Sequence, residues 1–135
     1  MTTQATNIQS RLPEGYKVVE EVNHNSSYYF YISTPKSTNT IKVRISDHDA
    51  ICVNSRSHIQ IIKSCGLITF NVDFFEDAVS ELSEMLGIDI SGYVYEVGRY
   101  GDVTLDFGKD WEVEEDVIAA WVAAKIETVN ILILY

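Results

Sequence analysis

The chain of 135 residues has the length of one domain, and its apolar fraction of 46% is that of an ordinary globular protein with a buried core. The net charge of −10 is unevenly distributed: residues 1–70 hold seven Lys/Arg and five Asp/Glu, whereas residues 71–135 hold three Lys/Arg and fifteen Asp/Glu. An acidic half of this kind disfavours direct binding to nucleic acid or to an anionic membrane and favours a basic partner surface. Solubility is the alternative explanation of the same charge.

No segment predicts secretion, membrane insertion or a metal centre. The first ten residues lack a basic segment followed by an apolar stretch, so we expect no signal peptide. Apolar stretches such as ILILY are far below the roughly 20 residues that span a bilayer. Cys52 and Cys65 lack CxxC spacing, which argues against a disulfide framework and a zinc site. We expect a cytoplasmic protein without a metal or a cofactor.

The first half of the chain predicts an arm followed by β-strands. Residues 1–13 are polar and include Pro13, which predicts a flexible N-terminal arm before a single domain at residues 14–135. Runs of apolar and aromatic residues, separated by turn-forming residues, then predict strands at 16–22, 26–33, 39–46, 49–55, 57–64 and 66–72. The sequence TPKSTN between the second and third of these strands predicts a β-hairpin.

The hydrophobic period changes to that of a helix at Asp73. We predict a helix over residues 73–87, capped by Asp73 and ended by Gly87, with an apolar stripe formed by Phe74, Ala78, Leu82 and Leu86, flanked by Phe75, Val79 and Met85. A second helix is predicted at 109–127, with an apolar side formed by Val117, Ile118, Trp121, Val122 and Ala124.

Two further segments complete the predicted sheet. Residues 91–108 predict a second hairpin around GRYGD, with Val103, Leu105 and Phe107 on one face. The nearly continuous apolar run at 128–135 predicts a strand buried on both faces. The expected fold is a single α+β domain, with a mainly antiparallel sheet of five to seven strands and two amphipathic helices.

The stretch IKVRISDHDA contains Ser46, Asp47 and His48 in succession, which are the residue types of a hydrolytic triad. Neighbouring residues of a strand face opposite sides of the sheet, so Asp47 cannot join the other two. A working triad also needs side chains that converge from different elements. We therefore do not expect a triad at this position.

The same stretch leaves one enzymatic alternative open. Asp47, His48 and His58, with Asp49 as a further candidate, form a metal or acid–base site if two strands present both histidines on one face. The spacing of ten residues between the histidines matches no compact ligand motif. A small metal-dependent nuclease or hydrolase is the alternative to a non-enzymatic protein.

The acids of the second half are the main candidate site. The helix dipole accounts for part of the acidic cluster at the start of the helix predicted at 109–127, but it does not account for Glu81 or Glu84. Carboxylates spread over a helix face and a hairpin resemble the charges of a phosphate backbone and would occupy a basic nucleic-acid channel. The predicted partner-binding residues are Glu81, Glu84, Glu96, Asp102, Asp106, Glu112, Glu114, Glu115 and Asp116.

Glu96, Asp102 and Asp106 have a second interpretation, because paired carboxylates on a hairpin can bind Mg²⁺ or perform acid–base chemistry. A nuclease also needs cationic surface nearby, and residues 71–135 offer only Arg99, Lys109 and Lys125. The partner-binding interpretation is therefore preferred for these three acids.

Residues 26–50, SSYYFYISTPKSTNTIKVRISDHDA, resemble a hairpin of small proteins from phages and other mobile elements, in which an aromatic strand precedes a (K/R)-(I/V)-R-(I/V)-S-D-H strand. The likeness is carried by Tyr28, Tyr29, Lys42, Arg44, Ser46, Asp47 and His48. In size and charge the chain is also similar to anti-CRISPR proteins, phage-encoded inhibitors of host defence. Many of these bind a nuclease complex and block its nucleic-acid path, and some mimic DNA charge.

This resemblance implies a non-enzymatic inhibitor that acts in the cytoplasm of the host cell. Its partner would be the basic surface of a protein or ribonucleoprotein defence complex, and it would not bind nucleic acid or a membrane itself. A third hypothesis is an acidic accessory subunit that works through oligomerisation, for which a homodimer is the simplest form.

Overall fold

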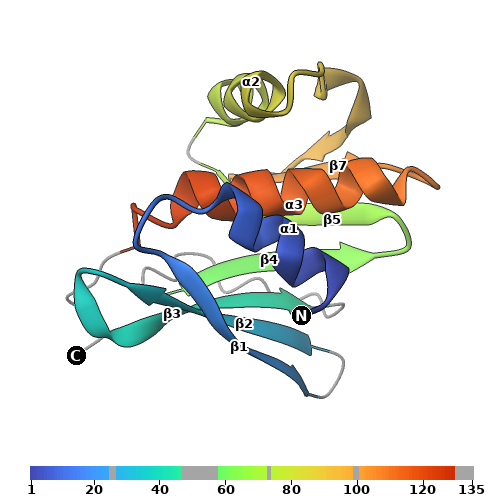
Figure 1. The fold of residues 1–135 in the computed structure, drawn as a ribbon. Helices are drawn as coiled ribbons and strands as arrows, with labels where there is room; N and C mark the ends of the chain where they lie inside the picture. The colour runs from blue at the N-terminus through green and yellow to red at the C-terminus, as the bar shows by residue number, and fades with distance from the viewer. Residues whose placement is uncertain (25–26, 47–57, 73, 99–100, 130–135) are drawn as a thin grey trace.

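The computed structural model describes residues 1–24, 27–46, 58–72, 74–98 and 101–129 (Figure 1). Within them the chain forms a single α+β domain with a mainly antiparallel sheet, as the sequence predicts, and with three helices where two were expected. The elements are α1 (Thr3–Arg11), β1 (Lys17–His24), β2 (Ser27–Thr34), β3 (Ser37–Ser46), β4 (His58–Ser64), β5 (Leu67–Asn71), α2 (Phe75–Leu86), the short 3-10 helix η1 (Ser91–Tyr93), β6 (Val94–Val97), β7 (Asp102–Asp106) and α3 (Trp111–Lys125).

The described strands form one sheet in the order β1-β2-β3-β4-β5-β7-β6. Neighbouring strands are antiparallel except β3 and β4, which are parallel, with Lys42 opposite His58. Because β7 lies between β5 and β6, strand β6 forms one edge of the sheet. The strand predicted at 49–55 lies outside the described residues, as does most of the one predicted at 128–135, where residues 128–129 form a turn and a bend.

One face of the sheet is apolar and is covered by α1 and α3 (Figure 1). Strand β3 shows why: Ile41, Val43 and Ile45 are buried, whereas the alternating Lys42 and Arg44 are only half-buried. The same alternation buries Val103 and Leu105 of β7 on this face. The period of two therefore determines which side of the sheet receives the helices.

Helix α3 is buried on most of its sides because the sheet, α1 and α2 all pack against it. The ring of Trp121 stacks on Phe70 of β5 with centroids 4.3 Å apart, and Lys125 Nζ lies 4.6 Å from the centroid of the Trp121 ring. The sequence predicts a single apolar side for this helix, yet Ala119 and Ala120 are also fully buried. Their small side chains allow neighbouring elements to approach α3 closely.

The predicted flexible arm is wrong for most of residues 1–13, because helix α1 forms there and buries Ala5 and Ile8 completely. Hydrophobic periodicity does not predict this helix, because α1 contains few apolar residues. Its polar side chains have partners on α3: Gln4 donates to the carbonyl of Glu115 at 3.1 Å, and Asn7 donates to the carboxylate of Asp116 at 2.7 Å. These hydrogen bonds join α1 to residues more than 100 positions away in the sequence. They therefore produce no local sequence pattern from which the helix could be predicted.

Helix α2 follows its predicted pattern except at Phe74 and at Met85, whose side chain is 38% exposed. Ala78, Val79 and Leu82 are buried, and Gly87 ends the helix in the left-handed conformation with φ 69°. The proposed cap Asp73 lies outside the described residues, and the N-cap position is Phe74, which makes no side-chain capping bond. Phe74 was expected in the apolar stripe, but its side chain is 71% exposed, because the residue precedes the helix with extended backbone.

A largely buried ion pair joins α3 to the sheet. Lys63 Nζ of β4 lies 2.9 Å from Glu114 Oε1 of α3, and the two side chains are 39% and 4% exposed. The lysine ammonium remains accessible to water. The carboxylate is not, so its negative charge is compensated by the lysine. Replacing the lysine should therefore lower the free energy of unfolding more than replacing the glutamate.

We predict that Lys63→Met lowers the free energy of unfolding by about 3 kcal/mol, because it leaves a buried carboxylate without a counter-charge. Glu114→Gln should cost only about 1 kcal/mol, because the half-exposed lysine becomes hydrated. Urea unfolding measures both values, with Lys109→Met as an exposed control that should change stability by less than about 0.5 kcal/mol. Equal losses for the two variants would contradict the assigned asymmetry.

The start of α1 provides a second prediction. The Thr2 hydroxyl accepts the N–H of Ala5 at 3.1 Å as the N-cap and donates to Glu21 Oε1 at 2.7 Å. This donated bond holds the pKa of Glu21 below its ordinary value of 4.5. We expect Thr2→Ala to cost about 1 kcal/mol at neutral pH.

A carboxyl with a lowered pKa stabilises the fold above its unfolded pKa and loses that contribution as the pH falls through its folded value. The difference between wild type and Thr2→Ala should therefore shrink below about pH 4.5 and approach the contribution of the cap alone. Thermal unfolding across this range measures the effect. Thr3→Ala, at an exposed helical position, is the control, and a pH-independent difference would exclude the role of Glu21.

Candidate functional site

The nine acids predicted to bind a partner divide into structural and exposed groups. On α3, Glu114 is buried against Lys63, and Asp116 accepts the bond from Asn7. Glu115 is half-buried and its carbonyl accepts the bond from Gln4. The structure thus places Glu114 in the interior, where it cannot meet a partner, and places the other two against α1. The sequence could not show this, because it predicts no helix at α1.

Glu112 is exposed at the start of α3, where a helix favours negative charge. The neighbouring N-cap residue, Asp110, accepts a hydrogen bond from the hydroxyl of Tyr93 at 3.3 Å. Partial burial raises the pKa of Tyr93 above its ordinary value of 10, and the Asp110 carboxylate raises it further. This contact joins the beginning of α3 to η1, so Glu112 belongs to the same end of the molecule as α2 and β6.

Asp102 and Asp106 shape turns. The carboxylate of the half-buried Asp102 occupies the space that a Cβ at position 98 would need, and the Asp102 carbonyl accepts the Gly98 N–H at 2.7 Å. Asp106 is exposed and accepts the N–H of Gly108 at 2.9 Å in the loop that leads to α3. Both acids are available to solvent, but local turn geometry already explains their presence.

Besides Glu112, the predicted residues that the structure leaves exposed without a hydrogen bond or ion pair among the described residues are Glu81, Glu84 and Glu96. They lie on α2 and the edge strand β6, at the end of the molecule far from β1–β3 (Figure 1). Three further exposed acids share this region and were not predicted as binding residues. We define the acidic end as the carboxylates of Glu76, Asp77, Glu81, Glu84, Asp89 and Glu96.

No cation within the same segment compensates the acidic end, because residues 74–98 contain no Lys, Arg or His. Glu84 occupies the last turn of α2, where the helix dipole opposes negative charge and where no basic residue is present. Asp89 has a local role as well: the Ser91 hydroxyl and N–H donate to its carboxylate and lower its pKa below 3.8. The other five carboxylates make no hydrogen bond or ion pair with any residue that the structure describes.

The acidic end also carries apolar side chains that sequence reasoning missed. Large apolar residues exposed in this segment are Phe74, Met85, Ile88, Tyr95 and Val97. Periodicity predicted Phe74 and Met85 as part of the core-facing stripe, and a four-residue edge strand gives too little pattern to orient Tyr95 and Val97. The sequence signal that could have indicated this apolar surface is that these residues occur in a stretch without cations.

A different surface is formed by β2 and β3 on the sheet face opposite α1 and α3. Tyr29 stacks on Tyr31 with centroids 6.5 Å apart, and Lys42 Nζ lies 5.5 Å from the centroid of the Tyr29 ring. Arg44 reaches the Ser27 hydroxyl at 3.4 Å, and its Nε is buried without a hydrogen-bond partner. These contacts place Lys42 and Arg44, the cations of the resemblance, on the side of the sheet away from the helices.

The enzymatic alternative rests on residues of which little is described. Asp47, His48 and Asp49 lie outside the described residues, and His58 is placed only as the first residue of β4. Within the described part of the chain, no group of three His, Cys, Asp or Glu side chains is arranged to hold a metal ion. The metal-dependent nuclease or hydrolase therefore stays a prediction. None of the helices in the described ranges is long and apolar enough to cross a membrane.

Comparison with known proteins provides no family for this chain. No protein-family model, no curated protein and no solved structure matches it.

Proposed function

We propose that this chain is a non-enzymatic binding protein whose acidic end occupies the basic nucleic-acid-binding surface of a host defence complex, in the manner of phage-encoded anti-CRISPR inhibitors. The proposal takes its host setting from the resemblance of the hairpin at residues 26–50 and of the size and charge of the chain. It takes its binding surface from the arrangement of exposed carboxylates on α2 and β6.

The observation that carries the proposal is the segment 74–98, which holds six exposed carboxylates and no cation. Ordinary soluble surfaces mix charges of both signs. In a patch of one sign, opposite charges do not cancel the electrostatic potential at the surface. Such a patch accelerates encounter with a basic partner and repels nucleic acid and anionic lipid. The unfavourable position of Glu84 at the C-terminal end of α2 shows that helix stability alone does not account for the pattern.

The structure also narrows the set of nine predicted residues. Glu114 is buried and the carboxylate of Asp116 accepts a bond from α1, so these two carboxylates support the fold. Glu115 contacts α1 through its backbone carbonyl. The proposed contact surface consists of the acidic end, with the exposed Glu112 and Asp106 at its border. A partner that binds through this surface should release it as the salt concentration rises, because screening weakens contacts between exposed charges.

Charge reversal tests the proposal. The double variant Glu81→Lys, Glu84→Lys should lose at least about tenfold in affinity for the partner, since each reversal replaces attraction by repulsion. Its fold should be retained, because both positions are exposed and a lysine in the last turn suits the helix dipole. Retention of purified CRISPR–Cas complexes on the immobilised protein, across a salt series, measures the affinity, and displacement of guide or target nucleic acid measures the inhibition.

The matched control is Glu14→Lys, Glu20→Lys, which changes the net charge equally at two exposed acids near β1. This control should retain binding at physiological salt. If both double variants bind equally well, the acidic end is not the contact surface and the charge serves solubility. If wild type retains no complex and displaces no nucleic acid, the proposed host target is wrong.

A further inference from the structure

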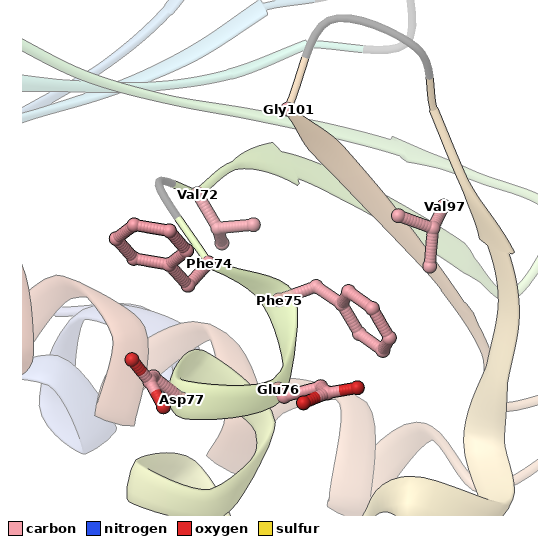
Figure 2. Close-up of a pocket in the computed structure, with 7 residues that line it drawn as sticks. All are labelled: Val72, Phe74, Phe75, Glu76, Asp77, Val97 and Gly101. Atoms are coloured by element: carbon pink, nitrogen blue, oxygen red, sulfur yellow. The ribbon is translucent and has the colours of Figure 1, made fainter.

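A pocket opens between the first turn of α2 and the β6–β7 hairpin, within the acidic end. Its volume is about 310 Å³, and it is lined by Val72, Phe74, Phe75, Glu76, Asp77, Val97 and Gly101. Figure 2 shows Val97 of β6 on one side and the two phenylalanines at the start of α2 on the other. The volume is at the lower end of the range for small-ligand pockets and is sufficient for one aliphatic side chain with its neighbours.

The walls of the pocket are held by the backbone. The N–H of Val72 donates to the carbonyl of Gly101 at 2.6 Å, which ties the end of β5 to the start of β7. Gly101 has φ +80°, and a Cβ at this position would approach the Val72 carbonyl oxygen at 2.9 Å. The hairpin therefore requires a residue without a side chain here. A wall built in this way is largely pre-formed before a ligand arrives.

Most of the lining is apolar, and two of its large apolar side chains are exposed. Phe74 is 71% exposed and Val97 is 44% exposed, although both are large apolar side chains. Phe75 is half-buried, and in Figure 2 its ring lies on the side of the opening nearest Val97. Single exposed apolar residues are normal on a protein surface, whereas several around one concave site mark an interaction site.

The charge around the pocket selects the kind of ligand. Glu76 and Asp77 form part of the wall, and residues 74–98 contain no cation, while Arg99 of the β6–β7 hairpin lies outside the described residues. The two wall carboxylates repel anionic groups, such as phosphates and acidic lipid headgroups. A Lys or Arg side chain is attracted both by the carboxylates and by the exposed ring face of Phe74, which accepts a cation–π contact.

We propose that the pocket receives an aliphatic side chain from a basic segment of the partner protein, with flanking Lys or Arg residues that contact Glu76, Asp77 and the Phe74 ring. This inference rests on the proposed function and specifies the partner: a cationic protein segment with an apolar anchor residue, in place of a uniformly basic surface. The apolar anchor fixes the position of the segment, and the carboxylates favour its approach.

Three capped peptides test the inference by NMR titration of the isotopically labelled full chain: KRLKR, KRSKR and SSLSS. KRLKR should shift the backbone amide signals of Val72, Phe75 and Val97. KRSKR should bind at least about tenfold more weakly, because it lacks the apolar anchor. SSLSS should also bind more weakly, because it lacks the cations that the acidic rim attracts.

Matched substitutions locate the site on the protein. Val97→Ser should reduce the affinity for KRLKR to that for KRSKR, whereas Val19→Ser, at a 53% exposed position on β1, should leave it unchanged. Glu76→Gln combined with Asp77→Asn should weaken KRLKR and leave SSLSS unaffected. Urea unfolding verifies that each variant is folded, which the exposure of all these positions makes the expected result.

Equal affinities for KRLKR and KRSKR would overturn the pocket inference and leave the acidic surface intact as the contact. Equal affinities for KRLKR and SSLSS would show a general apolar site and overturn the charge requirement. Absence of binding by all three peptides would also reject the pocket. The proposed function is decided separately, by the retention of complexes on Glu81→Lys, Glu84→Lys and its control.

Discussion

The packing of α3 against β4 and β5 is the contact on which the remaining architecture depends. A sheet with one apolar face must cover that face, and α3 does so through the stack of Trp121 on Phe70 and the ion pair of Glu114 with Lys63. Helices α1 and α2 then pack against α3. A change in the position of α3 would therefore displace both other helices, including the one that carries four of the six carboxylates of the acidic end.

The central position of α3 also separates the acids of the second half by role. Carboxylates on a helix surrounded by other elements must be paired or hydrogen-bonded, and Glu114 and Asp116 meet this requirement through Lys63 and Asn7. Helix α2 packs on one side only, so its acids face water. Much of the charge imbalance that reaches the surface is thus concentrated on α2 and β6, although the sequence spreads acids over the whole second half.

Apolar periodicity and turn-forming residues predicted the described strands, both hairpins and helices α2 and α3. Most of these elements bury a regular apolar face, whereas the edge strand β6 leaves Tyr95 and Val97 exposed. Periodicity did not predict α1, whose polar residues are held by partners on α3, nor the burial of Glu114, which depends on a lysine 51 positions away, as 114 − 63 = 51. The candidate site was predictable as an excess of charge. Its pocket was not, because Phe74 obeys the helical period of α2 but precedes the helix with extended backbone.

Charge and an exposed apolar pocket contribute different properties to a binding surface: the charge attracts a partner from a distance, and the pocket defines the position in which it binds. Carboxylates on flexible side chains accelerate encounter over distances of about 8–10 Å, but they are satisfied by many arrangements of cations and so define no unique register. An apolar pocket acts only on contact, and its fixed shape accepts few positions of an anchor residue. In this chain the two occur within residues 72–101, and the backbone bond between Val72 and Gly101 holds the pocket at a constant position among the carboxylates. In the proposed complex, orientation of the partner by the pocket would therefore follow its capture by the charge.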